Sequence, residues 1–166
     1  NGVSKAYCMT GWRLGYCGGP KDIIAGMNKI QSQSTTSTSS ISMAASVEAL
    51  NGNQDFIEKH NIQFKKRRDM VVEKLNKIQG LSCAVPSGAF YIYPSCVGVI
   101  GKQTPKGNTI NSDEDFMNFL LDSEGVAGVH GEAFGLSPYF RISYATDHKT
   151  LIDACERIER ACSNLK

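Results

Sequence analysis

The sequence predicts an α/β fold, and three observations support this class. After Gly80, helical patterns alternate with short segments of strand character over about 85 residues, which is typical of an α/β lobe. The composition is that of a globular protein, with 41% hydrophobic and 20% charged residues in 166. No apolar run approaches the roughly 18 residues that a membrane span requires, and a net charge of +2 gives no reason to expect nucleic acid. We therefore expect a soluble protein that binds neither membrane nor nucleic acid.

The first fifty residues predict one short strand and two helices. Residues 12–19 have strand character and end in a glycine pair, after which Pro20 suits the start of a helix over 21–32. The serine- and threonine-rich segment 32–42 is expected to be an ordered loop whose hydroxyls cap helix ends. An alanine-rich helix follows over 42–50. The apolar face of the first helix consists of Ile23, Ile24, Met27 and Ile30.

A long amphipathic helix is predicted over 54–79, with Gly80 as its C-terminal stop. At about 26 residues it would be about 39 Å long, enough to bridge two lobes. The basic run 65–68 spreads around such a helix, so we interpret it as a solvated face. The apolar stripe consists of Phe56, Ile57, Phe64, Val71, Leu75 and Ile78.

Short strands and two helices are predicted beyond Gly80. Ser112 is a good N-cap for a helix over 113–123. The first turn of this helix carries three acidic residues, whose negative charges interact favourably with the helix dipole. Thr146 or Asp147 is expected to cap a final helix that ends near residue 163. The predicted strands are 81–85, 89–93, 126–129 and 140–144.

Six cysteines stand at positions 8, 17, 83, 96, 155 and 162, and none forms a C-x-x-C pair or a zinc-like spacing with histidine. A disulfide framework is typical of smaller secreted chains. We therefore predict reduced, mostly structural thiols, no metal site and a cytoplasmic location. The chain starts at Asn1 without a signal-peptide pattern before its first methionine, Met9, and is expected to be a piece of a longer polypeptide.

Residues 2–15 carry two cations in a glycine-rich setting. Lys5 lies among small and apolar neighbours, and Arg13 follows eight residues later. A partly desolvated lysine near a fixed positive charge can act as an amine nucleophile, and arginine offers forked donors to a phosphate. The pair would suit a cofactor that has both a carbonyl and a phosphate. The spacing equally allows an exposed lysine and a salt-bridged arginine.

The segment NGVSKAYCMTGWRLGYCGGP resembles the pyridoxal 5'-phosphate (PLP) lysine segment of class I, fold-type I aminotransferases, and is most similar to bacterial aspartate aminotransferases of the aspartate/prephenate subgroup. SQSTTS, PSGAFYIYP and FRISYAT continue the resemblance in the family's order. It implies the C-terminal portion of such an enzyme. Residues 1–50 would be a remnant of the large PLP-binding domain with open strand edges, and 51–166 the bridging helix plus the small α/β domain.

The resemblance also implies cofactor-binding roles. Lys5 matches the lysine that forms a Schiff base with PLP and then moves the proton between the substrate Cα and the cofactor. Arg13 matches the arginine that grips the cofactor phosphate. Gly2 stands where the family often has a phosphate-contacting serine, and Ser4 is the candidate that replaces it.

Two further positions are implied to bind substrate. Arg141 matches the arginine that holds the substrate α-carboxylate as a bidentate pair, although on a strand it could also pair with a surface acid. Phe90 matches an aromatic residue that lines the substrate site. No arginine lies between Arg13 and Arg67, where an animal-type subgroup has one for the distal carboxylate. The choice of substrate therefore stays open.

The implied function is transfer of an amino group between an amino acid, aspartate or glutamate, and a 2-oxo acid by a homodimeric enzyme. In the family's order, the residues that hold the cofactor ring precede the lysine, so this fragment alone is expected to be inactive. The alternatives are an aromatic, alanine or prephenate-type aminotransferase, and a non-catalytic binding or assembly module.

Overall fold

The computed structural model describes all 166 residues and divides them into two compact units, Asn1–His60 and Asn61–Lys166. The boundary between the units falls inside the long helix α3 (Asp55–Asn76). The assignment of the two parts to a large and a small enzyme domain stays a prediction. No helix combines the length and apolar character that crossing a membrane would demand.

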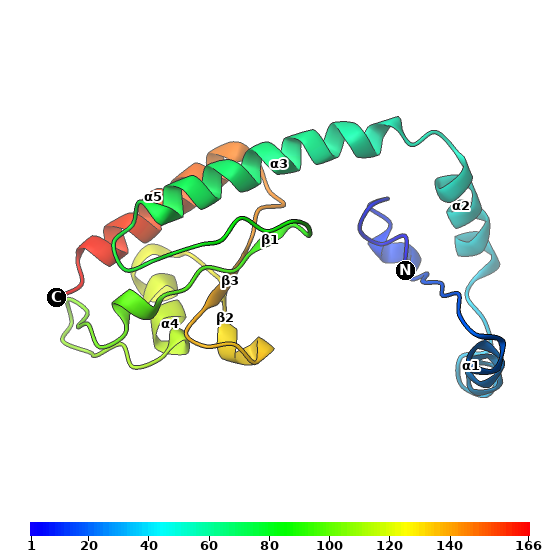
Figure 1. The fold of residues 1–166 in the computed structure, drawn as a ribbon, viewed down its shortest axis with the longest axis horizontal. Coiled ribbons are helices and arrows are strands. Elements are labelled where there is room, and N and C mark those ends of the chain that lie inside the picture. The colour runs from blue at the N-terminus through cyan, green and yellow to red at the C-terminus, as the bar shows by residue number, and fades with distance from the viewer. The chain divides into compact units, whose positions relative to one another are not determined.

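The first unit contains α1 (Lys21–Ser34), α2 (Ser40–Asn51) and the start of α3 (Figure 1). Both predicted helices are confirmed, and α1 begins directly after Pro20. The hydroxyl-rich loop is shorter than predicted because both of its ends continue the helices, which leaves only residues 35–39 between them. This connection is tight: the N–H groups of Thr35 and Thr36 both donate to the Gln31 carbonyl, and Thr36 has a left-handed φ of 66°.

The predicted strand over 12–19 is wrong. Thr10–Trp12 form a 3₁₀ turn, Arg13 has a left-handed φ of 51°, and a single antiparallel bridge joins Gly2 to Gly15. Three of the eight residues in this segment are glycine, which weakens a strand, and the unit offers no other strand for pairing. The expected open strand edges in residues 1–50 are therefore absent.

The first unit buries little apolar surface. Val3 is its one buried apolar side chain, while Ser42 and Ser46 are buried on α2. The segment before α1 and both following helices instead expose large apolar side chains: Trp12, Tyr16, Ile23, Met27, Ile30, Ile41, Met43, Val47 and Leu50. Apolar exposure of this extent is typical of surfaces that contact protein, membrane or ligand.

A three-stranded antiparallel sheet with the order β1-β3-β2 lies in the second unit (Figure 1). Its strands are β1 (Tyr91–Ile92), β2 (Val129–His130) and β3 (Phe140–Ser143). On the central strand, Phe140 is fully buried and Arg141 lies on the opposite face, because successive side chains alternate. The register pairs Tyr91 with Ser143, which places Tyr91 on the same face as Arg141.

These strands are shorter than predicted, and one is missing. Residues 81–85 form no strand, and only Ser82 makes an isolated bridge, to Ser95. Pro86 cannot donate to a ladder, and Ala89 has a left-handed φ of 64°. Both interrupt the pairing that the sequence pattern predicts.

Helices cover the core face of the sheet. The predicted N-caps of two of them are confirmed, whereas α3 ends at Asn76, before its predicted stop at Gly80. The helices are α4 (Asp113–Glu124), α5 (His148–Ser163) and the C-terminal part of α3. Ser112 and Asp115 form a capping box, in which each side chain accepts the other residue's backbone N–H. Gly125 ends α4 with a left-handed φ of 66°. Asp147 caps α5 by accepting the N–H of Thr150 at 3.0 Å.

The core of the second unit is one hydrophobic cluster. Phe116 on α4 and Phe140 on β3 are fully buried and meet edge to face, with ring centroids 5.5 Å apart. The helix α5 runs alongside α3 (Figure 1), where Lys74 lies 4.0 Å from Glu156. Of the predicted α3 stripe, only the C-terminal part is buried. The helices contribute Val71, Leu75, Leu120, Leu151, Cys155, Ile158 and Cys162 to the cluster.

All six cysteines are free thiols. Cys8 and Cys17 are exposed, and the other four are buried. Burial raises the pKa of Cys96 and Cys162 to about 12, because the thiolate loses its hydration in the apolar core. The buried thiols therefore behave as small apolar side chains.

Candidate functional site

The segment around Lys5 is a loop that its own backbone closes. Gly2 and Gly15 form the antiparallel bridge, and Asn1 and Tyr16 exchange two hydrogen bonds of 2.7 and 2.8 Å. A Cβ atom on either glycine would lie 3.3 Å from a carbonyl oxygen across the bridge, so glycine permits this close approach. Residues 2–15 are thus one folded segment within the first unit.

Three predicted residues belong to this closed loop. Lys5 is exposed, and its carbonyl accepts the N–H of Cys8 at 3.1 Å in a turn. Arg13 is exposed as well, and its guanidinium donates to the carbonyl of Thr10 at 3.3 Å. Ser4 is half-buried. One segment therefore carries an amine, a guanidinium and a hydroxyl.

Tyr7 ties the closed loop to the start of α3, inside the first unit. Its hydroxyl donates to Oε1 of Gln54 at 3.0 Å, and its ring meets the edge of Phe56 with centroids 6.1 Å apart. The Gln54 amide in turn donates to the carbonyls of Ala49 and Gly52, at 2.9 and 2.8 Å. Sequence reasoning missed this anchor, because its partner lies 47 positions away.

Arg141 lies between two aromatic rings in the second unit. Its Cζ is 4.4 Å from the ring centroid of Tyr91 and 4.2 Å from that of Phe134. The half-buried guanidinium makes no hydrogen bond or ion pair within the chain, which favours ligand binding over the alternative of a surface ion pair. Its five N–H donors are therefore available to a ligand.

Phe90 is half-buried and packs against both the core cluster and the ring of Tyr91, with centroids 4.3 Å apart. Its predicted contact with substrate stays a prediction. Of these two neighbours, it is Tyr91 that contacts Arg141. Neither Tyr91 nor Phe134 was identified as a site residue from the sequence, and nothing in the pattern GEAFG indicated Phe134.

A buried carboxylate holds the connection that carries Phe134. Asp113 is 1% exposed, and its Oδ2 accepts backbone N–H groups of Gly131, Glu132 and Tyr139 at 3.2, 3.3 and 3.2 Å. These donors lie at both ends of the connection between β2 and β3. From the sequence, Asp113 was expected only to interact favourably with the helix dipole, as one of three acidic residues in the first turn of α4.

Tyr93 supports the same connection from the other side. Its hydroxyl donates to the carbonyls of Gly131 and Leu136 at 3.0 and 3.3 Å. Burial raises the pKa of Tyr93, and so does the negative charge of Asp113, while Arg141 lowers it. The phenol thus remains a neutral donor well above neutral pH.

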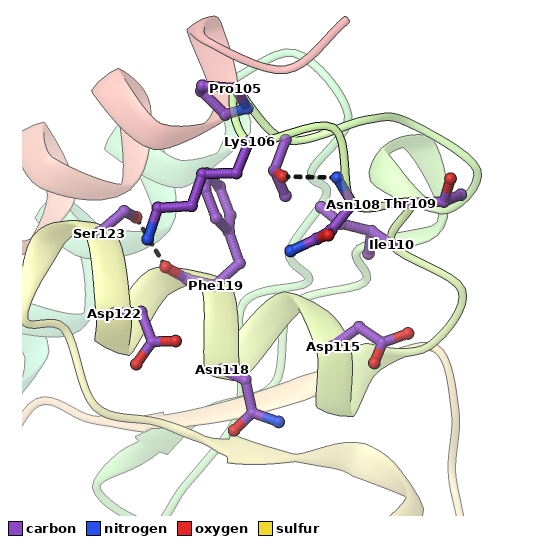
Figure 2. Close-up of a pocket in the computed structure, with 11 residues that line it drawn as sticks. Pro105, Lys106, Asn108, Thr109, Ile110, Asp115, Asn118, Phe119, Asp122 and Ser123 are labelled. Carbon is purple, nitrogen blue, oxygen red and sulfur yellow. Dashed lines mark hydrogen bonds between the residues drawn. The ribbon is translucent and has the colours of Figure 1, made fainter.

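A separate cavity of about 400 Å³ opens between the loop 104–110 and α4 (Figure 2). Lys106 and Asn108 line its loop side, and Phe119 and Asp122 its helix side. None of the predicted site residues lines this cavity. Its mixture of one cation, carboxylates and a single ring points to no particular ligand chemistry.

Comparison with known proteins places the chain in a family. Residues 1–158 match the aminotransferase class I and II family. A probable aspartate/prephenate aminotransferase of Rhizobium leguminosarum bv. phaseoli is 58% identical over 166 residues, which are 100% of this chain and 42% of the relative. The crystal structure of an aspartate aminotransferase from Rhizobium meliloti matches with a TM-score of 0.97 at 57% identity, over 100% of this chain and 42% of that one. The structure of an aromatic aminotransferase from Pyrococcus horikoshii OT3 matches with a TM-score of 0.86 at 35% identity. The match covers 98% of this chain and 42% of that one.

The fold and these matches show that the chain belongs to the class I and II aminotransferases. Within that family it is similar to rhizobial aspartate and aspartate/prephenate aminotransferases, which confirms the resemblance found in the sequence. The chain spans about 42% of the length of these relatives.

Proposed function

We propose that the complete protein carrying this chain is a PLP-dependent aminotransferase that moves an amino group between an amino acid, aspartate or glutamate, and a 2-oxo acid. It would act in the cytoplasm as a homodimer. The observation that carries the proposal is the loop closed by Gly2 and Gly15, because it holds Lys5 and Arg13 in one folded segment of a chain that matches the family throughout.

The donor set of this loop fits PLP. The amine of Lys5 suits the aldehyde, while the forked donors of Arg13 and the hydroxyl of Ser4 suit the phosphate. Gly11 adds access, because a Cβ atom there would meet nothing within 4 Å. When bound, PLP supplies an aldehyde that captures the amino group and a ring that accepts electron density from the substrate Cα.

Residues of this chain would carry out proton transfer and substrate binding. The Nζ atom of Lys5 would take the proton from the substrate Cα and return it during the reaction. Arg141 would bind the α-carboxylate through two parallel N–H groups, while the rings of Tyr91 and Phe134 hold its guanidinium plane. Arg141 would thereby fix the orientation of the carboxylate that it binds.

A second candidate substrate class follows from the same residues. The chain has no arginine between Arg13 and Arg67 that could bind a distal carboxylate, and Arg141 has aromatic rings on both faces. We therefore infer that aromatic 2-oxo acids, whose side chains carry no distal carboxylate, are acceptors as well. Turnover of the complete protein with aspartate, prephenate and aromatic 2-oxo acids distinguishes these possibilities.

The apolar side chains exposed on α1 and α2 support the proposed assembly. They include Ile23, Met27 and Val47, which are unfavourable in water. We infer that the rest of the large domain and the second subunit cover them. The 166-residue chain alone is expected to show no turnover.

The decisive experiment adds PLP to the complete protein and records its visible absorbance and its transamination of aspartate. Lys5→Ala should abolish both the protein-bound band and turnover. Arg13→Ala should keep the band but raise the PLP concentration needed for it. Lys21→Ala, which changes an exposed lysine at the start of α1, is the matched control and should leave both unchanged. A band and turnover that survive in Lys5→Ala would refute the assignment, and a wild-type protein with neither would support the non-catalytic module.

A further inference from the structure

We propose that Asp113 is a positioning residue that sets the affinity for the substrate carboxylate by fixing Phe134 against Arg141. The inference rests on the proposed function, because it assigns Arg141 to carboxylate binding. Asp113 itself would touch neither substrate nor cofactor.

One oxygen atom of Asp113 accepts hydrogen bonds from both ends of the connection between β2 and β3. Oδ2 accepts from Gly131 and Glu132 where the connection begins and from Tyr139 where it ends, all within 3.2 to 3.3 Å. A carboxylate makes stronger bonds to backbone N–H groups than a neutral acceptor does. The three bonds therefore reinforce the backbone bond of 2.7 Å from the Gly131 N–H to the Tyr139 carbonyl, which joins the same two ends.

The helix does not need this carboxylate for its cap. Ser112 and Asp115 already form the capping box of α4, which satisfies the N–H groups of both residues without Asp113. Burying a carboxylate is costly unless hydrogen bonds compensate. The burial of Asp113 at this position is therefore explained by the connection that it binds.

The connection makes a sharp turn between its two anchored ends. A Cβ atom on Gly131 would lie 2.0 Å from the carbonyl oxygen of Leu136, so the backbone is folded tightly on itself. Tyr93 donates to the carbonyls of these same two residues. Phe134 lies in this turn, 48% exposed, and its ring covers Arg141 at 4.2 Å.

Backbone bonds such as Gly131 N–H to the Tyr139 carbonyl would keep the turn closed without Asp113, but loss of the anchor would loosen it and make the ring of Phe134 less ordered over Arg141. The Arg141 guanidinium would then become ordered only when substrate binds, and the entropy cost of this ordering weakens substrate binding. The proton transfer by Lys5 would not change. The expected signature is a raised KM with a preserved kcat. A purely structural role would instead lower the amount of folded enzyme and leave KM unchanged.

The test uses the complete enzyme, loaded with PLP, and aspartate as the amino donor. Asp113→Ala should raise KM about tenfold, keep kcat within about threefold and leave the cofactor spectrum unchanged. Asp113→Asn should have a smaller effect, because its amide oxygen can still accept. Tyr93→Phe keeps the ring, removes the hydroxyl bonds to the same turn, and should raise KM in the same direction, which keeps the proposal testable if Asp113→Ala does not fold.

Asp115→Asn is the matched control, since Asp115 lies in the same first turn of α4 and its carboxylate accepts two backbone N–H groups of the cap. It should lower stability and leave KM unchanged. If Arg141→Ala raises KM while Asp113→Ala and Tyr93→Phe match wild type, or Tyr93→Phe alone does where Asp113→Ala does not fold, the positioning role is refuted and the proposed function stands. If Arg141→Ala itself leaves KM unchanged, the carboxylate site is misassigned and the inference fails with it.

Discussion

The guanidinium of Arg141 lies between the rings of Tyr91 and Phe134, with its Cζ 4.4 and 4.2 Å from the two ring centroids. The three residues come from β3, β1 and the turn after β2. The two rings confine the guanidinium, while its N–H groups keep no hydrogen-bond partner within the chain. Bidentate recognition of a carboxylate requires this arrangement, a confined guanidinium with free N–H groups.

Arg141→Lys should therefore impair substrate binding although the charge is kept. A single ammonium cannot make two parallel bonds, and its flat stacking is lost, so we expect KM for aspartate to rise at least about tenfold. Steady-state kinetics of the complete enzyme measure this change, and the visible cofactor band should persist. Arg160→Lys, a surface arginine paired with Glu124 at 2.9 Å, is the control and should change nothing. Disappearance of the cofactor band in Arg141→Lys would show that the arginine has a structural role.

The capping box of α4 should be worth a measurable part of the stability. Ser112→Ala removes the side-chain acceptor for the Asp115 N–H, so the free energy of unfolding should fall by about 1 kcal/mol. Urea unfolding of the 166-residue chain, followed by far-UV circular dichroism, measures it. Ser123→Ala lies in the last turn of the same helix, where its hydroxyl donates to the Phe119 carbonyl, and should change stability by less than about 0.5 kcal/mol. Equal losses in the two variants would mean that the cap contributes nothing specific.

The helices could be predicted from the sequence because their signals are local. Pro20, Ser112 and Asp147 mark helix starts within one turn of the residues they affect, and Gly125 ends α4 through its own φ. The strands were less predictable. A left-handed residue such as Ala89 interrupts a ladder, and the alternation of apolar residues does not reveal it.

The candidate site could be predicted only in part, for a related reason. Motif resemblance singled out Lys5, Arg13 and Arg141, because each lies in a characteristic short segment. The residues that surround them come from distant parts of the chain: Phe134 covers Arg141 from another connection, and Asp113 holds that connection from α4. Such contacts depend on tertiary packing, which short-range sequence patterns do not encode.

The edge-to-face pair in the core should dominate the stability of the second unit. Phe116→Ala would leave a cavity against Phe140 and lower the free energy of unfolding by about 3–5 kcal/mol. Leu121→Ala, on the same helix but 52% exposed, should cost less than about 1 kcal/mol and is the control. Urea unfolding of the 166-residue chain gives both values. A cost for Phe116→Ala similar to that of Leu121→Ala would show that this contact is not part of a packed core.

The thiols should differ sharply in their reactivity toward an aromatic disulfide reagent at pH 8. Cys8 and Cys17 are exposed and should react at once, whereas the four buried thiols should react only after unfolding. A thiolate is the reacting species, and burial raises the pKa of Cys155 to about 11 and that of Cys96 and Cys162 to about 12. Absorbance of the released thiol counts two reactive groups in the folded chain and six in urea. Six fast thiols without urea would contradict the buried core.

The same raised pKa values predict that stability falls in alkaline solution. The unfolded thiols would ionise near their ordinary pKa of 9.0, while Cys96 and Cys162 stay protonated in the folded chain up to about 12. Between these values the folded state binds more protons, so the free energy of unfolding decreases as the pH rises, whereas below pH 9 these thiols contribute no pH dependence. Urea unfolding at pH 8, 9 and 10 should therefore show a steeper decline for the wild-type chain than for the double variant Cys96→Ala, Cys162→Ala. The double variant is less stable at pH 8 because it leaves small cavities. The comparison therefore uses the slope of the free energy of unfolding against pH, not its absolute value. Parallel slopes would mean that the two thiols do not couple ionisation to folding.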